Sequence, residues 1–182
     1  YNYWSLTSLK NFFENFDATI YKSEKIDTHG GSLRIFIKKG KNHKPDKSII
    51  NLLKEEESTG LKSYKIYEDF GKKVKVIREN VKKNISNLKL NGKKLIGYGS
   101  PAKATTALNY FGISKEIDFK IEDNKLKQGK FVPGVKIPIN SKKKVISKNN
   151  NMLVLAWNFF KDIKKNNKDL SDNFINIKDL LN

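Results

Sequence analysis

A short apolar run in the middle of the chain ends in a glycine-rich turn and passes directly into a helical segment. The turn, Gly97-Tyr98-Gly99-Ser100-Pro101-Ala102, fits the pattern G-x-G-x-x-G/A. A strand, a tight turn and a helix in this order begin a βαβ unit, in which a diphosphate can bind at the helix N-terminus. The feature predicts an α/β fold with a parallel sheet and indicates a nucleotide or nucleotide-linked ligand. By itself it names no reaction.

The residues after this turn continue the alternation of strands and helices. Met152–Ala156 is fully apolar, as buried strands of parallel sheets are. Pro101 is expected at the first helical position, where its missing N–H costs nothing. The further expected elements are helices over Pro101–Tyr110 and Phe159–Asn166, strands over Phe119–Glu122 and Phe174–Ile177, and a short strand within Val135–Ile139.

The residues before the turn predict a helix, two strands and two more helices. The expected elements are a helix over Ser5–Phe16, strands over Ala18–Ile26 and Ser32–Lys38, a helix from an Asp46 cap to about Ser58, and a long helix from about Ser63 to Leu88. Apolar residues recur every three or four positions along the long helix, so we expect it to pack on a domain or in a dimer seam.

The amino-acid composition limits the classes of partner that we expect for this chain. The 182 residues carry a formal net charge of +18, but Arg34 and Arg78 are the only arginines. Specific nucleic-acid recognition favours arginine for its bidentate geometry, so we interpret the dispersed lysines as solvated faces and do not expect nucleic acid as a partner. No apolar run is long enough for a membrane span, and the absence of cysteine removes disulfide and thiolate chemistry. A cytoplasmic location is the default expectation.

The glycine turn supplies the first candidate site residues. Gly97 would permit the tight turn, Gly99 would let the backbone approach a phosphate, and Lys103 could add a cation. About 20 residues further on stand Glu122 and Asp123, where dinucleotide sites place an acid that binds a ribose. A plain strand–helix turn without a ligand is the alternative.

Two loops contain further candidate site residues, for which the sequence evidence is weaker. Residues 128–134, Gln-Gly-Lys-Phe-Val-Pro-Gly, are expected near the carboxyl ends of the strands, where open α/β sheets bind ligands, although an ordinary surface loop fits as well. His29 lies in the turn Thr28–Ser32 and could carry a proton, but an incidental hairpin histidine is equally consistent. His43 is expected to be exposed. Two distant histidines and no cysteine make a metal site within this chain implausible.

These stretches together resemble the C-methyltransferases that act on nucleotide-linked deoxysugars such as dTDP-ketosugars. The matching stretches are residues 28–34, THGGSLR; 97–103, GYGSPAK; 108–113, LNYFGI; 123–124, DN; 127–134, KQGKFVPG; 137–139, IPI; and 156–158, AWN. Their order and spacing fit along nearly the whole chain. Two departures are Glu122, where the family usually has Asp, and Lys125, where a proline is frequent.

The resemblance implies a protein of three parts, namely a zinc-binding N-terminal domain, a domain that binds S-adenosylmethionine (SAM), and a C-terminal Rossmann-like domain. On that basis residues 1–43 would form the last helix and two strands of the SAM domain. Residues 44–90 would be connecting helices, and residues 91–182 would form the Rossmann-like three-layer domain. The zinc ligands, the SAM site and a Tyr-x-Glu-His segment linked to catalysis would then precede Tyr1. No cofactor is expected within the chain, and the remainder of the methyltransferase would be its partner.

The resemblance also implies the chemistry and the substrate site. A base removes a proton made acidic by the sugar's carbonyl group, and the resulting enolate attacks the SAM methyl group. Near the diphosphate we expect Gly97, Gly99, Ser100 and Lys103, with Glu122, Lys127, Gln128, Trp157 and Asn158 along the rest of the cleft. His29 would lie near the domain junction. A nucleotide-binding module without catalysis and a SAM-dependent transferase with another acceptor remain alternatives. The sugar, the methylated carbon and the oligomeric state are open.

Overall fold

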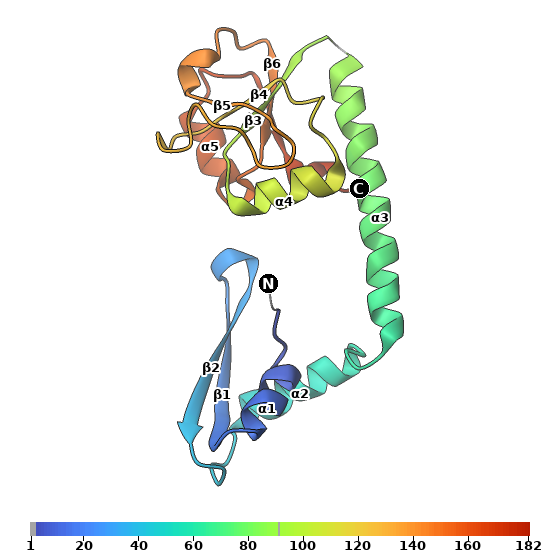
Figure 1. Ribbon diagram of the computed structural model, residues 1–182, viewed down its shortest axis with the longest axis vertical. Coiled ribbons are helices and arrows are strands. Elements are labelled where there is room, and N and C mark those ends of the chain that lie inside the picture. Colours follow the sequence, from blue (N-terminus) through green and yellow to red (C-terminus); the bar gives the residue numbers. More distant parts are fainter. Residues whose placement is uncertain (1–2, 91) are drawn as a thin grey trace. The chain divides into compact units, whose positions relative to one another are not determined.

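The computed structural model describes residues 3–90 and 92–182, and these form two compact units (Figure 1). One unit ends at Gly71 and the other begins at Lys72, so the division falls inside helix α3 (Tyr64–Leu90). The domain boundaries expected from the sequence at residues 43 and 90 stay a prediction. None of the helices in the described part of the chain combines the length and apolar character that crossing a membrane requires.

The first unit is a β-hairpin packed on helices. It consists of α1 (Leu6–Glu14), β1 (Ala18–Ile26), β2 (Ser32–Lys39) and α2 (Lys47–Ser58). The strands pair antiparallel, and a 3-10 turn at Thr28–Gly30 joins them. Leu6, Ile20 and Ile49 form its buried core, one from each of α1, β1 and α2. These elements confirm the helices and strands predicted for this part of the chain.

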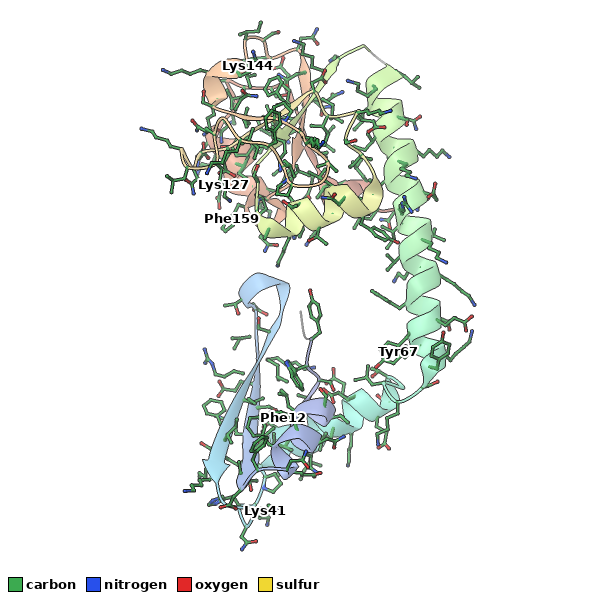
Figure 2. The ribbon with its side chains drawn as sticks, viewed as in Figure 1. Phe12, Lys41, Tyr67, Lys127, Lys144 and Phe159 are labelled. Carbon is green, nitrogen blue, oxygen red and sulfur yellow. The ribbon has the colours of Figure 1, made fainter. Side chains whose placement is uncertain are left out.

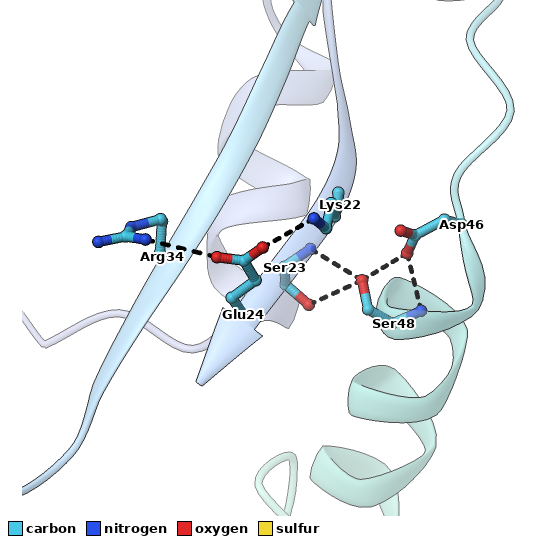
Figure 3. A network of polar contacts seen from close by, with 6 residues as sticks. All are labelled: Lys22, Ser23, Glu24, Arg34, Asp46 and Ser48. Atoms are coloured by element: carbon cyan, nitrogen blue, oxygen red, sulfur yellow. Dashed lines mark hydrogen bonds and ion pairs between the residues drawn. The ribbon is translucent and has the colours of Figure 1, made fainter. Parts of the chain in front are cut away.

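Polar contacts fix the start of α2 against the hairpin (Figure 3). The Asp46 carboxylate caps the helix as predicted, accepting the backbone N–H of Ser48 at 2.8 Å. The Ser48 hydroxyl donates to Asp46 and accepts the backbone N–H of Ser23 on β1 at 2.8 Å. Across the hairpin, the Arg34 guanidinium lies 3.5 Å from the Glu24 carboxylate. Partners on two strands and a helix cap therefore set the geometry of this unit.

The second unit contains a five-stranded parallel sheet. Its strands are β3 (Lys94–Tyr98), β4 (Phe119–Ile121), β5 (Ile139–Asn140), β6 (Asn150–Val154) and β7 (Asn173–Asn176), in the order β5-β4-β3-β6-β7. The chain winds outward from β3 in one direction and then from β6 in the other. The strand order therefore reverses between β3 and β6, which is the position where open α/β sheets bind ligands. The predicted α/β fold with a parallel sheet is confirmed.

Helices cover both faces of this sheet and make three layers. One face packs against α3 and α4 (Ala102–Phe111); its buried residues include Val81, Ile85, Leu95, Ala104, Leu108, Leu153 and Leu155. The other face packs against α5 (Phe160–Asn166); its residues include Ile96, Tyr98, Ile121, Met152, Val154 and Ile163. Buried apolar side chains on both faces explain why Met152–Ala156, the segment that includes most of β6, is a continuous apolar run.

Most element boundaries lie within two residues of the sequence prediction, and three of the differences have a clear structural cause. Instead of a strand over Val135–Ile139, only β5 forms, because Lys136 takes a positive φ of 56° and turns the chain. β6 begins at Asn150, two residues before the predicted start, since the buried side chains of Asn150 and Asn151 find backbone carbonyl partners. Pro101 is the N-cap of α4, with an extended ψ of 158°, rather than its first helical residue.

Candidate functional site

The candidate site is built on the turn that follows β3, at the carboxyl edge of the sheet. Gly99 has a φ of +87°, and a Cβ there would lie only 2.9 Å from the Cβ of Ala156, which follows β6. The Gly99 N–H donates to the carbonyl of Ile121 on β4 at 2.9 Å. The turn therefore passes tightly between the ends of the two neighbouring strands, and only glycine can make this approach.

Gly97 has a different role from the one the motif predicts. It lies inside strand β3 without a positive φ, so it does not form the tight turn, and that part of the prediction is wrong. Its missing side chain makes room for Lys120, its register partner on β4. A Cβ at position 97 would lie 2.9 Å from Cγ of Lys120 and 3.2 Å from Cδ1 of Leu155.

We expect Gly97→Ala to destabilise the second unit by about 2 kcal/mol, because an added methyl group overpacks a filled core. In a Lys120→Ala background the same substitution should cost much less, since the side chain it would strike is gone. Urea denaturation of the single and double variants measures the coupling. Additive effects of the two substitutions would show that Lys120 is not what requires glycine at position 97.

Lys120 is a fully buried charged residue in the three-residue strand β4. Its ammonium nitrogen has no hydrogen-bond partner among the described residues. Burial lowers the pKa of Lys120 from 10.5 to about 8, and the nearby Glu122 carboxylate offsets only part of this effect. Sequence reasoning missed this residue, although a lysine between two apolar residues, Phe119 and Ile121, in a predicted strand was a usable signal.

Ser100 stands at the centre of a small cage of hydrogen bonds. Its N–H donates to the Glu122 carboxylate at 2.7 Å, and its carbonyl accepts the Lys127 ammonium at 2.9 Å. Lys127 lies on the loop that follows β4 (Figure 2). The Gln128 side chain donates to the Glu122 carbonyl at 2.7 Å. The structure thus brings four of the predicted site residues into direct contact.

Glu122 is already engaged by the protein backbone. Besides Ser100, its carboxylate accepts the N–H of Asn124 at 3.1 Å. A ribose hydroxyl would have to share these oxygens, and a phosphate that needed the Ser100 N–H would compete with a carboxylate for it. Contact between Glu122 and a ligand therefore stays a prediction, whereas its bonds to the turn are part of the fold.

The neighbouring acid, Asp123, serves a second polar cluster on the face that carries α5. The Tyr98 hydroxyl donates to one Asp123 oxygen at 2.8 Å, and the Lys142 ammonium lies 2.8 Å from the other. Burial acts to raise the pKa of Asp123, but the hydrogen bonds from Lys142 and Tyr98 outweigh it and leave the pKa below its usual value. Burial raises the pKa of Tyr98. This cluster ties the strand ends together.

A pocket of about 250 Å³ opens beside the Ser100 cage. Its lining includes Ser100, Thr105, Lys127, Lys130, Phe131 and Pro133. One wall is held by Asn109 of α4, whose side-chain amide donates to the carbonyl of Pro133 at 2.9 Å and to that of Thr105 at 2.8 Å. The pocket therefore combines two lysines with apolar residues beside the first turn of α4, a composition suited to an anionic ligand.

The remaining predicted residues lie in different places. Lys103 is exposed on the first turn of α4, and Trp157 and Asn158 are in the 3-10 turn after β6, at the same edge of the sheet. Trp157 packs partly into the core and Asn158 is exposed. His29 belongs to the turn between β1 and β2 in the other unit, and its side chain lies outside the described residues. Across residues 3–90 and 92–182, no group of three metal-ligating side chains gathers.

Comparison with known proteins places this arrangement in a family. Residues 27–176 match the family described as the C-methyltransferase C-terminal domain. The chain is also 31% identical over 176 residues to the C-methyltransferase NovU of Streptomyces niveus. That alignment covers 95% of this chain and 42% of the relative, so the chain spans less than half of NovU. By its sequence over 27–176 and its parallel α/β unit, this chain belongs to the C-methyltransferase C-terminal domain family.

Proposed function

We propose that the chain is the substrate-binding C-terminal part of a SAM-dependent C-methyltransferase whose acceptor is a nucleotide-linked ketosugar of the dTDP type. The observation that carries the proposal is the glycine turn at the switch point of a parallel sheet, in a chain whose family is that of C-methyltransferases. The pocket beside Ser100 is lined by Lys127 and Lys130, which supply positive charge, and helix α4 supplies N-terminal N–H groups after the turn Gly97–Lys103. Both features suit the diphosphate of such a ligand.

The first unit would be covered by the rest of the methyltransferase. Its surface carries an aromatic cluster in which the Phe12 ring lies 5.7 Å from Trp4 and 5.0 Å from Phe16, centroid to centroid. All three side chains are exposed, and Phe12 projects from α1 (Figure 2). Exposed rings grouped in this way are typical of a surface that another protein segment covers. NovU, more than twice as long as its matched region, has room for such a segment.

The chemistry would be divided between this chain and the residues around it. Methyl transfer to a ketosugar carbon requires a base for the acidic proton and a bound SAM as methyl donor. The catalytic base, the SAM site and a zinc-binding domain would belong to the parent protein outside this chain. The role of residues 91–182 would be to hold the nucleotide, so that binding energy from the diphosphate fixes the sugar in a reactive position.

Titration of the complete protein with dTDP tests this assignment. We expect measurable binding by calorimetry, and we expect Lys103→Ala to weaken it about fivefold, the loss of roughly 1 kcal/mol for an exposed cation near a phosphate. The matched control is Lys168→Ala, an exposed lysine beyond α5. Equal dTDP affinity in the wild type and Lys103→Ala would remove Lys103 from the site.

Methyl transfer itself separates the proposal from its alternatives. The complete protein, supplied with SAM and a dTDP-linked ketosugar, should yield a product heavier by one methyl group in mass spectrometry. Binding of dTDP without methyl transfer to any ketosugar would favour a nucleotide-binding module. Methyl transfer to a different acceptor class, with no dTDP binding, would favour another transferase.

A further inference from the structure

Two polar side chains beside the glycine turn have no role in the contacts described so far. The Lys120 side chain is fully buried, and Ser100 is 9% exposed. Neither the Lys120 ammonium nor the Ser100 hydroxyl has a hydrogen-bond partner within the described ranges. Buried polar groups are nearly always satisfied in folded proteins, so one unsatisfied group in the turn and another on the neighbouring strand β4 require an explanation.

The position of Lys120 is fixed by its neighbours in the sheet. Its Cα lies opposite Gly97 on one side and Ile139 on the other, and its side chain fills the space that a Cβ at Gly97 would occupy. The charged groups that act on it are Glu122 and Lys127. These same two side chains hydrogen-bond the N–H and the carbonyl of Ser100. The ammonium group therefore interacts with the same two charged side chains that hold the Ser100 peptide.

A lysine in this position is costly to the fold. A buried cation loses its hydration, and an unpaired one regains little of it from the protein. A methionine would fill the same volume without that cost. The low dielectric of the protein interior destabilises the buried ammonium group, and it also strengthens the attraction between that group and a nearby anion. The ten-residue helix α4 begins at this turn and directs its N-terminal N–H groups and positive dipole end toward the same point.

We propose that Lys120 is a buried cation that draws the phosphate groups of a nucleotide ligand to the turn Gly97–Lys103, acting through space from strand β4. The Ser100 hydroxyl, which lines the pocket, is the neighbouring group that gains a partner when a phosphate binds. Lys120 is thus a positioning residue for the ligand. The inference rests on the proposed nucleotide binding and adds to it the residue that makes the site selective for a charged phosphate.

The test compares Lys120→Met with the wild type in the complete protein at pH 7. With dTDP and inorganic pyrophosphate as probes in calorimetry, we expect Lys120→Met to bind both at least tenfold more weakly. Hydrogen exchange should show that the second unit of the variant is at least as stable as that of the wild type. If Lys120 had only a structural role, affinity would fall only together with stability. The control Lys168→Met removes an exposed charge and should change neither quantity.

The possible results separate the inference from the proposed function. Unchanged dTDP affinity in a folded Lys120→Met variant would overturn the role of Lys120 and leave nucleotide binding intact. Failure of the wild type to bind either probe would overturn both. If the variant does not fold, proton uptake by the wild type decides the matter.

That second measurement uses calorimetry at pH 8 in buffers of different ionisation enthalpy. Lys120 is about half protonated at this pH, because its pKa is about 8, with Glu122 and Lys127 as the charged groups acting on it. A phosphate nearby stabilises the ammonium form, so binding of dTDP should take up roughly half a proton per ligand. Binding without proton uptake would overturn the inference.

Discussion

Replacing Lys120 with methionine is expected to make the second unit more stable by about 3 kcal/mol at pH 7. The pKa of Lys120 is 10.5 in an exposed chain and about 8 in the fold. Each pKa unit corresponds to about 1.4 kcal/mol of difference between the two protonation states. The folded protein therefore binds the Lys120 proton more weakly than the unfolded chain does, and this difference destabilises the fold at pH 7. Methionine has no charge and removes the destabilisation. Hydrogen exchange of the amides of β6 measures the change.

The dependence of this difference on pH distinguishes the charge from simple packing. Below pH 8 Lys120 is protonated in both states, so the full cost is present. Between pH 8 and 10.5 the folded form loses its proton first and the stability of the wild type rises. The advantage of the variant should therefore fall to about 1.4 kcal/mol at pH 9.5. An advantage that stays constant from pH 7 to pH 9.5 would show that volume, not charge, is responsible.

Gly99→Ala is expected to destabilise the second unit by about 3 kcal/mol. Part of this comes from the φ of +87°, which costs a residue with a side chain roughly 1 kcal/mol or more. The remainder comes from the added Cβ, which would lie 2.9 Å from Ala156 Cβ and 3.5 Å from its backbone nitrogen. Neither atom can move without shifting the end of β6, so overpacking adds about 2 kcal/mol.

Gly129 provides a matched control for this prediction. Its φ is +75°, but a Cβ there would have open space around it. We expect Gly129→Ala to cost only about 1 kcal/mol, the backbone part alone. Denaturant unfolding of both variants gives the difference. Equal losses of stability in the two variants would show that the close approach to Ala156 does not constrain position 99.

The parallel sheet could be predicted because an apolar strand, the glycine turn and a helix follow one another, and because Met152–Ala156 is fully apolar. The glycine motif located the turn, and the Asp46 cap located the start of α2. Boundaries were less secure where polar residues enter the core. Asn150 and Asn151 extend β6 because distant carbonyl groups accept their amides, a condition that no local pattern reveals.

The residues alone determined the α/β class of the second unit, the place of the turn and a family resemblance that the comparisons bear out. Only the tertiary structure decided what the turn residues do. Gly97 accommodates Lys120 rather than bending the chain, and Glu122 binds the Ser100 amide. The reason is physical: periodicity reports which face of a strand is buried, whereas the partner of a buried charge is set by strands that the fold alone brings together.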